Sequence, residues 1–397
     1  MRYAERILRT PPSFIREILK VAEQPDVISF AGGLPNPAAF PTDALRLSAE
    51  RAVRREGHKL FQYAATEGYP PLREYLAEKY RKKHGLNIGP EDVLITGGSQ
   101  QALDLLGKTL ISKGDGVIVE APGYLGGLQA FSLYEPTFLP VPLAPDGPDL
   151  DALEAAAARP GAACFYTVPN FQNPTGATYS AAKRRAVREI LDRRDILLIE
   201  DDPYGELRFR GTPLPYMSAD RLERGVLLGT FSKTVAPGMR LGWLITANRE
   251  LMRFLATAKQ AGDLHTSVFC QGVVHDYLTN NDYEEHVASI VRLYGPQQET
   301  MLRALRERFP ASARCAAPDG GMFLWVALED GLAAVDVFAA ASRRKVAFVP
   351  GDPFYTDRTR VNTLRLNFTN TSPEGIRTGM RLLGEAVREC AEKKRER

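Results

Sequence analysis

Cysteine is scarce in this sequence of 397 residues, which has only four, Cys164, Cys270, Cys315 and Cys390. They lie far apart and form no CxxC pair, so the pattern argues against a disulfide framework and a paired-cysteine zinc site. The five histidines show no HExxH spacing, and we expect no metal. Such cysteine usage favours a reducing compartment, so the cytoplasm is the expected location.

Long hydrophobic runs and an excess of one charge are also lacking. No apolar stretch approaches the length of a membrane span. The first residues carry an acid, Glu5, and lack the apolar core of a secretory signal. The formal net charge is only +3, which gives no reason to expect binding to nucleic acid or to an anionic membrane.

Short apolar runs alternate with helical patterns through the middle of the chain. The runs occupy 93–96, 117–119, 164–168, 196–199, 226–228 and 241–245. They are continuous rather than alternating, as in strands that are buried on both faces. Between them, 101–110 carries apolar residues at helical spacing and 180–191 opens on a serine that can cap a helix. This alternation predicts an α/β fold with a mostly parallel sheet.

The pattern changes after about residue 250. Residues 251–259 and 271–305 look helical, strand-like pieces follow at 321–326, 346–349 and 363–368, and a last helix follows Ser372. Mixed helices and strands predict a second, smaller α+β domain. We therefore expect an N-terminal segment (1–50) that packs against the small domain and covers the active site, a large domain (51–295) and a small domain (296–397).

The most informative stretch lies just after the apolar run 226–228. Thr230 and Ser232 offer hydroxyls, Lys233 an amine and Arg240 a guanidinium. Hydroxyl and guanidinium groups suit a phosphate, and an amine forms a Schiff base with a carbonyl. A ligand with both a phosphate and an aldehyde is pyridoxal 5′-phosphate (PLP). Taken alone, the stretch also fits a surface lysine in a turn rich in Ser and Thr.

Three more polar motifs follow apolar runs, and in a parallel sheet all four would meet at the carboxyl edge, where α/β proteins bind ligands. The segment 96–100, Thr-Gly-Gly-Ser-Gln, joins glycines to a helix start, which favours a phosphate. An ordinary capped loop is the alternative. The segment has neither the P-loop lysine nor the GxGxxG spacing, so a nucleotide fold is not indicated.

The segment 170–176 contains Asn173 followed by proline, and it also fits a common turn. In the functional interpretation, Asn173 hydrogen-bonds to the 3-hydroxyl oxygen of PLP. After the run 196–199, Pro203 ends a strand, so that Asp201 lies at its carboxyl end. There Asp201 can pair with the pyridine nitrogen and keep it protonated, which makes the ring an electron sink. Tyr204 can donate to the 3-oxygen. A magnesium site is the competing interpretation of this acidic run, but no nucleotide motif accompanies it.

Two further residues follow or interrupt apolar runs. Tyr124 comes after 117–119 and can stack on the cofactor ring, although a core aromatic is the alternative. Arg365 is a guanidinium within the apolar run 364–368, and a charge placed there needs a partner. A substrate α-carboxylate bound in a bidentate fork is one such partner, and a structural salt bridge is the other.

Together these residues resemble the fold-type I PLP-dependent aminotransferases, most closely the subgroup of 2-aminoadipate and kynurenine/aminoadipate aminotransferases. The resemblance runs from the segment 29–35, Ser-Phe-Ala-Gly-Gly-Leu-Pro, to Arg365. It implies a large domain with a seven-stranded, mostly parallel sheet and a homodimer with shared active sites. It also implies ping-pong transfer of an amino group from an amino acid to a 2-oxo acid, with 2-oxoglutarate as the expected acceptor.

The resemblance also implies a role for each matching residue. The roles are Lys233 as the Schiff-base lysine, Asp201 as the pyridinium partner, Asn173 and Tyr204 on the 3-oxygen, Tyr124 on the ring face, Ser99, Gln100, Ser232 and Arg240 on the phosphate, Tyr63 on the phosphate of the partner subunit, and Arg365 on the substrate α-carboxylate.

Substrate choice depends on the N-terminal segment. Arg16 lies in the amphipathic helix start 12–19, and the resemblance implies that it meets a distal substrate carboxylate. A solvated surface arginine is the alternative. Gly33 and Leu34 are expected to line the same pocket. The expected donors are therefore 2-aminoadipate, glutamate, leucine or an aromatic amino acid.

Two rival functions share the cofactor residues. One is a PLP-dependent lyase or decarboxylase on the same fold, which release of ammonia or CO₂ would reveal. The other is the PLP-binding effector domain of a transcription regulator. Such a regulator needs an N-terminal DNA-binding domain, and because the aminotransferase pattern begins by about Ile15, we expect none here.

Overall fold

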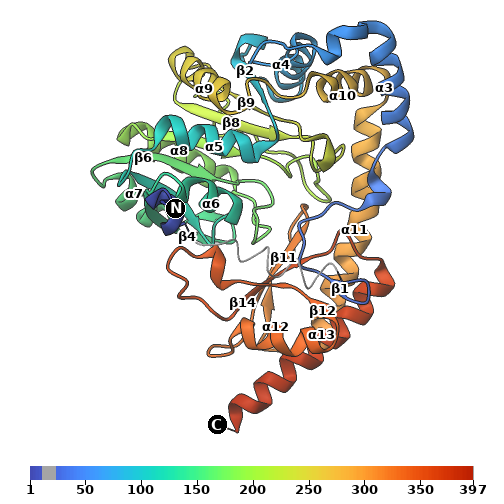
Figure 1. The fold of residues 1–397 in the computed structure, drawn as a ribbon. Coiled ribbons are helices and arrows are strands. Elements are labelled where there is room, and N and C mark those ends of the chain that lie inside the picture. Colours follow the sequence, from blue (N-terminus) through green and yellow to red (C-terminus); the bar gives the residue numbers. More distant parts are fainter. Residues whose placement is uncertain (11–23, 397) are drawn as a thin grey trace.

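The computed structural model describes residues 1–10 and 24–396, so the predicted helix start around Arg16 lies outside the described part of the chain. The largest element is a sheet with the strand order β2-β9-β8-β7-β6-β3-β4-β5 (Figure 1). Its strands are β2 (Val93–Thr96), β3 (Gly116–Ala121), β4 (Thr137–Ala144), β5 (Gly147–Pro148), β6 (Ala162–Thr167), β7 (Leu197–Asp201), β8 (Gly225–Thr230) and β9 (Gly242–Ile245).

Most of this sheet is parallel. The pairs β3·β4, β3·β6, β6·β7 and β7·β8 are parallel, whereas β9 runs antiparallel to both β2 and β8. The two-residue β5 pairs antiparallel with β4 at the edge and adds an eighth strand to the seven expected. The predicted α/β fold with a mostly parallel sheet is thus confirmed.

One strand, β4, is not predicted by the apolar runs. Pro140 and Pro142 interrupt its hydrophobic pattern, and proline cannot donate a hydrogen bond to a neighbouring strand. The structure accommodates both prolines because β4 lies near the sheet edge, where only the short β5 follows it. An edge position therefore explains why a strand forms where the sequence signal is weak.

Helices cover both faces of the large sheet and bury its apolar residues. On one face lie α5 (Ser99–Leu110), α6 (Leu125–Ser132) and α9 (Arg249–Gly262), and on the other lie α4 (Pro70–His84), α7 (Leu150–Ala157), α8 (Ala181–Arg194) and α10 (Val268–Asn280). Ser180 caps α8 by accepting a hydrogen bond from the backbone N–H of Lys183 at 3.2 Å, as predicted.

A smaller antiparallel sheet is built from the C-terminal part of the chain. Its order is β10 (Arg314–Cys315), β11 (Phe323–Ala327), β14 (Thr363–Asn367) and β13 (Val349–Pro350). β1 (Ile28–Ser29) pairs with β12 (Val346–Ala347), which ties the N-terminal segment to this region. The helices α12 (Ala334–Arg343) and α13 (Pro373–Arg395) pack beside it, and α13 begins after Ser372, as predicted.

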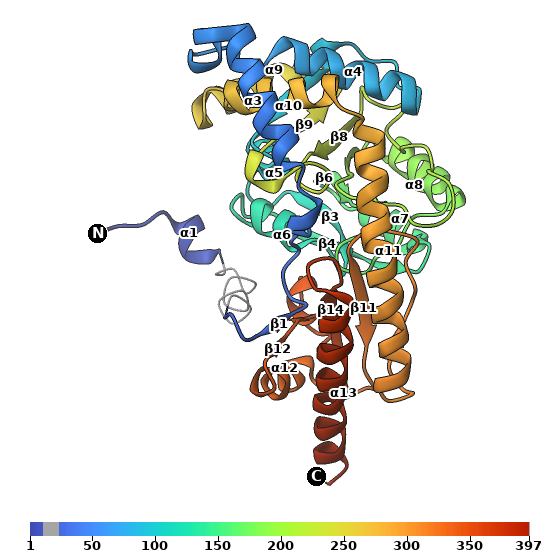
Figure 2. The ribbon, with the colours of Figure 1, turned by 90° about the vertical axis from the view of Figure 1, so that its right-hand side faces the viewer.

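The sequence predicts one continuous helix over 271–305, and this is wrong, because the structure has two helices there. α10 ends at Asn280, and α11 (Tyr283–Arg308) begins after Asp282, whose carboxylate accepts a hydrogen bond from the backbone N–H of Glu285. α11 then runs past both sheets (Figures 1 and 2). The boundary expected between residues 295 and 296 falls inside this helix, and the division into three parts stays a prediction.

The remaining elements are short or lie near the N-terminus. They are α1 (Glu5–Arg9), α3 (Thr42–Glu56) and the 3₁₀ turns η1 (Pro37–Ala39), η2 (Gly57–Phe61), η3 (Pro90–Asp92), η4 (Pro237–Met239) and η5 (Asp352–Phe354). Within the described residues, no helix combines the length and the apolar character needed to cross a membrane.

We expect the substitution Leu228→Ala to destabilise the protein, because the side chain of Leu228 in β8 is completely buried in the main core. Removing its methyl groups leaves a cavity, and the free energy of unfolding should fall by about 2–5 kcal/mol. Urea unfolding followed by circular dichroism measures this as a lower midpoint. Val335→Ala is the control, since Val335 is 47% exposed, and it should change stability by less than about 0.5 kcal/mol. Equal midpoints for the two variants would contradict this account of the core.

Candidate functional site

A cavity of about 240 Å³ lies at the carboxyl ends of the central strands, between the large sheet and the small one. Every predicted site residue that the structure describes lines it, except Leu34 and Tyr63. They arrive there because β2, β6, β7 and β8 all end at the same edge of the sheet. Arg365 reaches the cavity from β14 of the small sheet.

Lys233 follows β8 and points its amine into this cavity. Its Nζ donates a hydrogen bond to the backbone oxygen of Gly33 at 2.9 Å. Burial, together with the positive charges of Arg365 and Arg240, lowers the pKa of Lys233 to about 8. A neutral amine is a nucleophile and a base, so Lys233 is placed and tuned to attack a carbonyl or to accept a proton.

Asp201 ends β7, lines the same cavity and is almost completely buried. One carboxylate oxygen, Oδ2, accepts a hydrogen bond from the hydroxyl of Tyr166 at 2.9 Å. The other, Oδ1, has no hydrogen-bond partner among the described residues. Burial raises the pKa of Asp201 to about 7. A buried acceptor without a partner is costly, so this oxygen is suited to a donor on a bound ligand.

Arg365 is nearly fully buried without a carboxylate partner in the described part of the chain. Its Nη1 donates to Oδ1 of Asn173 at 2.8 Å and its Nη2 to the backbone oxygen of Ala31 at 2.7 Å, while Nε has no partner among the described residues. The guanidinium lies 4.4 Å from the ring centre of Phe323. Burial lowers the pKa of Arg365 to about 10. These contacts disfavour the alternative of a structural salt bridge.

Asn173 joins Arg365 to a second polar side chain. Its Nδ2 donates to the hydroxyl of Tyr204 at 3.3 Å, so both residues predicted to hold the 3-oxygen lie side by side. Tyr124, just before α6, lines the same cavity. Burial raises the pKa of Tyr124 to about 12, so its hydroxyl keeps its proton at neutral pH.

A group of donors gathers at the start of α5. Ser99 and Gln100 are its first two residues, and the backbone N–H groups of a helix's first turn have no partner within the helix. The hydroxyl of Thr230 lies 2.9 Å from that of Ser232. Arg240 donates to the backbone oxygen of Gly97 at 2.8 Å. Hydroxyls, a guanidinium and a helix N-terminus together suit a phosphate.

Glycine is needed at Gly98 for this arrangement. Its φ of +91° is unfavourable for other residues, and a Cβ atom there would lie 2.8 Å from Nη2 of Arg240. Gly242, where β9 begins, is equally constrained, because its Cβ would meet the backbone of Gly98 at 2.8 Å. The turn and the arginine therefore fit together only without side chains at these two positions.

Two of the predicted residues that the structure describes, Tyr63 and Leu34, are not part of the cavity wall. Tyr63 is 79% exposed, with its ring edge-on to His265, and Leu34 is 54% exposed. The backbone oxygen of Leu34 accepts a hydrogen bond from the hydroxyl of Thr369 at 2.9 Å, next to the cavity residue Gly33. Arg16 lies outside the described residues.

Sequence reasoning missed Tyr166, which holds Asp201, and Phe323, which stacks on Arg365. Both sit within apolar strands, where an aromatic residue looks like ordinary core. The alternation of side chains along β6 could have predicted which face of the sheet Tyr166 lies on. It could not have predicted the contact of Tyr166 with Asp201 of β7.

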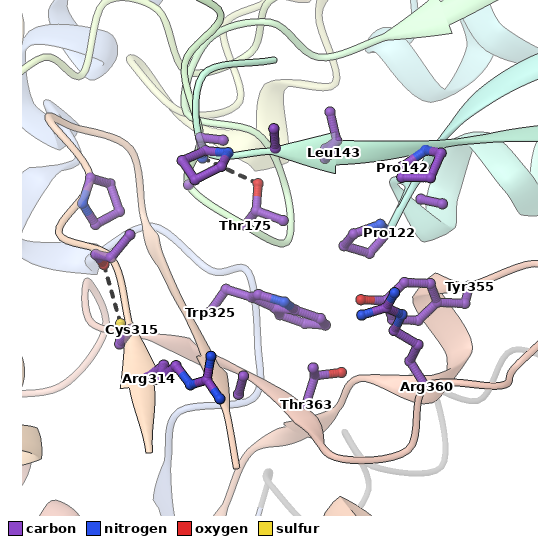
Figure 3. Close-up of a pocket in the computed structure, with 18 of the residues that line it drawn as sticks. Pro122, Pro142, Leu143, Thr175, Arg314, Cys315, Trp325, Tyr355, Arg360 and Thr363 are labelled. Carbon is purple, nitrogen blue, oxygen red and sulfur yellow. Dashed lines mark hydrogen bonds between the residues drawn. The ribbon is translucent and has the colours of Figure 1, made fainter. Parts of the chain in front are cut away.

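A second, larger cavity of about 820 Å³ opens on the other side of the loop that carries Asn173 (Figure 3). Pro142 of β4 and the loop residues Pro122 and Thr175 line one wall, and Trp325 and Thr363 of the small sheet line the other. It contains none of the predicted site residues.

The side chains that line the smaller cavity fit the predicted cofactor, PLP. The unpaired oxygen of Asp201 suits a protonated ring nitrogen, the amine of Lys233 suits an aldehyde, and the donors around Ser99 suit a phosphate. Among the residues that the structure describes, no three side chains of His, Cys, Asp or Glu are grouped to hold a metal ion.

Comparisons with known proteins agree with this chemistry. The sequence model of the family aminotransferase class I and II matches residues 26–383. The chain is 40% identical to aromatic-amino-acid aminotransferase 1 of Thermococcus litoralis, over 98% of this chain and 94% of that protein. It is 41% identical to 2-aminoadipate transaminase of Thermus thermophilus, over 96% of this chain and 95% of that protein.

Among solved structures, the chain is similar to LysN, the alpha-aminoadipate aminotransferase of Thermus thermophilus, complexed with N-(5′-phosphopyridoxyl)-L-leucine. The TM-score is 0.91, the identity is 39%, and the match covers 98% of each chain. The whole architecture of the chain therefore has a counterpart in a solved structure.

We expect the amine of Lys233 in the cofactor-free protein to react with formaldehyde and cyanoborohydride with a pH midpoint near 8, well below the ordinary lysine value of about 10.4. Mass spectrometry of the Lys233 peptide measures the modified fraction at each pH. The variant Arg240→Gln removes one of the positive charges that lower this pKa, and its midpoint should lie higher. A midpoint above about 10 in the unaltered protein would refute this view of the site.

Proposed function

Because this chain belongs to the aminotransferase class I and II family and is a PLP-dependent enzyme, we propose that it moves an amino group from an acidic, aliphatic or aromatic amino acid to 2-oxoglutarate. The fold-type I architecture and the family predicted from sequence are both confirmed. The buried guanidinium of Arg365, which shares one small cavity with Lys233, is the observation that carries the proposal.

The side chains of the cavity divide the work between binding and proton transfer. When bound, PLP supplies an aldehyde carbon that carries the amino group and a ring that takes up an electron pair. Arg365 binds the substrate α-carboxylate, since its Nε lacks a partner among the described residues and its two Nη atoms are held in place. Lys233 lines the same cavity, and its amine would serve as the base that takes up and gives back a proton at the substrate α-carbon.

Asp201 and Asn173 complete this arrangement around the cofactor ring. Asp201 keeps a proton on the ring nitrogen, because its free Oδ1 accepts a hydrogen bond that no described residue supplies. Asn173 and Tyr204 hold the 3-oxygen, and Tyr124 stacks on the ring. The phosphate is bound by Ser99, Gln100, Thr230, Ser232 and Arg240.

In this proposal, the N-terminal segment determines which amino acids the enzyme accepts as amino donors. Gly33 lines the cavity and Leu34 follows it with an exposed side chain, so a substrate side chain leaving the cavity passes these two residues. One relative is named for 2-aminoadipate and another for aromatic amino acids, which supports a pocket that accepts both classes. We assign Arg16 to the distal carboxylate of acidic donors.

The alternatives left open by the sequence are less well supported. A lyase or decarboxylase would use the same cofactor residues, and a regulatory domain would bind PLP without turnover. The similar proteins described above are aminotransferases with matching length, which favours amino-group transfer over both.

The proposal extends to a homodimer whose partner contributes Tyr63. Its phenol ring is 79% exposed, and the nearby Phe61 is 68% exposed. Large exposed aromatic side chains are typical of surfaces that bind another protein. The proposed location is the cytoplasm, in keeping with free Cys164, Cys270, Cys315 and Cys390.

Donor preference is tested with a panel of 2-aminoadipate, glutamate, leucine and phenylalanine, with 2-oxoglutarate as acceptor. For Arg16→Ala we expect kcat/KM for 2-aminoadipate and glutamate to fall about tenfold or more, because a charged hydrogen bond is lost, while leucine is spared. Arg9→Ala is the control, since Arg9 pairs with Glu5 and Glu135 on the surface, and it should change nothing. Equal losses of kcat/KM for all donors would contradict the role of Arg16. If the unaltered enzyme transferred no amino group from any donor, the proposed function would be wrong.

The shared active site is tested by mixing two damaged subunits. Lys233→Ala and Tyr63→Ala should each have little activity at low PLP. In a two-fold dimer that shares residues across its interface, random mixing gives hybrids with one intact site, and about a quarter of the normal activity should return. If Tyr63 served its own subunit, every site would keep one defect and no activity would be regained.

A further inference from the structure

We propose that Glu120 is a positioning residue that fixes the loop 168–179 and, through Asn173, sets the guanidinium of Arg365 for the substrate carboxylate. This inference rests on the proposed function, because it takes Arg365 as the carboxylate-binding group. Glu120 lies near the end of β3, is 2% exposed and does not line the cavity of about 240 Å³.

The carboxylate of Glu120 holds the loop at both ends. At the start of the loop, Oε1 accepts hydrogen bonds from the backbone N–H of Val168 at 3.0 Å and from the hydroxyl of Thr167 at 2.7 Å. At its end, the hydroxyl of Tyr179 lies 2.7 Å from the same oxygen. One side chain therefore contacts both ends of the loop that joins β6 to α8.

The tip of the loop is held through Gln172, which is completely buried. Its Nε2 donates to Oε2 of Glu120 at 2.8 Å and to the backbone oxygen of Pro122 at 2.9 Å. Its Oε1 accepts from the backbone N–H and the hydroxyl of Thr175, at 2.8 and 2.7 Å. All four hydrogen-bonding positions of this amide are thus used, and a fully satisfied buried network is rigid.

The loop borders a cavity on each side. Thr175 and Gly176 form part of the wall of the larger cavity of about 820 Å³, together with Pro122 (Figure 3). The inner side faces the substrate cavity through Asn173. The loop is a partition between two cavities, and its position is set by the network behind it.

The network ends at the substrate-binding group. Asn173 directly follows Gln172, and its Oδ1 is one of only two hydrogen-bond acceptors for Arg365 among the described residues. A shift of the loop therefore moves the partner that orients this guanidinium. The affinity of the site for a carboxylate should depend on Glu120, although Glu120 touches neither substrate nor Arg365.

The substitution Glu120→Gln tests this with little change in shape. Two of the partners, the backbone N–H of Val168 and the amide Nε2 of Gln172, are obligate donors on different oxygens of Glu120. A glutamine at position 120 has only one side-chain oxygen, so it can accept a hydrogen bond from only one of these two donors. Its NH₂ group must then lie against the other donor, and that hydrogen bond is lost. Turning the Gln172 amide over would only move the conflict to the backbone N–H of Thr175.

The experiment measures how the PLP-saturated enzyme binds 3-phenylpropionate, a carboxylate without an amino group, by isothermal titration calorimetry. For Glu120→Gln we expect Kd to rise about tenfold, the effect of losing one hydrogen bond in a charged site. KM for amino donors should rise more than kcat falls. The control Asp276→Asn alters a buried carboxylate on α10 that pairs with Arg51 and Arg55, and it should lower stability and leave Kd unchanged.

Two further variants guard against a folding defect. Tyr179→Phe removes a single hydroxyl from the network and should weaken 3-phenylpropionate binding in the same direction but less. Adding Gln172→Glu to Glu120→Gln restores a donor–acceptor pair between the two positions but removes the donor to the backbone oxygen of Pro122. It should therefore recover only part of the lost affinity. A loss that comes only from unfolded protein would lower kcat and leave KM and Kd as they were.

The outcomes separate this inference from the function on which it rests. An unchanged Kd in both Glu120→Gln and Tyr179→Phe, with a lower melting temperature, would show that Glu120 only stabilises the fold and would overturn the inference. If the unaltered enzyme did not bind 3-phenylpropionate, or if Arg365→Lys bound it equally well, the carboxylate site itself would be absent, and the proposed function and this inference would fall together.

Discussion

Three ionisable side chains, Lys233, Asp201 and Arg365, share a cavity of about 240 Å³ without forming an ion pair with one another. Burying such groups costs free energy unless each is paired. The protein reduces this cost in different ways: the pKa of Lys233 is lowered, the pKa of Asp201 is raised, and Arg365 is held by neutral oxygens. The remaining cost is what a ligand with a phosphate, a ring nitrogen and a carboxylate would remove.

The fold brings these groups together because parallel strands end at one edge. β7 and β8 deliver Asp201 and the turn with Lys233, and the partition loop after β6 delivers Asn173. The small sheet supplies Arg365 from the other side. Each group is then fixed by a residue behind it, as Tyr166 fixes Asp201 and Gln172 fixes the loop of Asn173. Tyr166 and Gln172 thus hold parts of the cavity wall although neither lines the cavity.

Much of the fold follows from local signals in the sequence. Continuous apolar runs predict the central strands, and Ser180 and Ser372 mark the starts of α8 and α13. The misses have physical causes. β4 contains two prolines, which fit because only the short β5 pairs with its outer side. The break between α10 and α11 depends on the cap at Asp282, which lies inside a long helical pattern.

The site is predictable where function demands an unusual residue at a strand end. Lys233, Asp201 and Arg365 stand out because a charge beside an apolar run needs a reason. Glu120 and Tyr166 do not stand out, since their roles exist only through contacts across neighbouring strands and loops. Tyr63 is a third case, since its side chain is exposed and does not line the cavity of its own chain.

The most direct test of the account is to find where the cofactor is covalently attached. The protein is saturated with PLP, reduced with borohydride, digested and analysed by peptide mass spectrometry. The account predicts one phosphopyridoxyl group per chain, on the peptide that contains Lys233. An unmodified Lys233 peptide, or the group on another lysine, would contradict it.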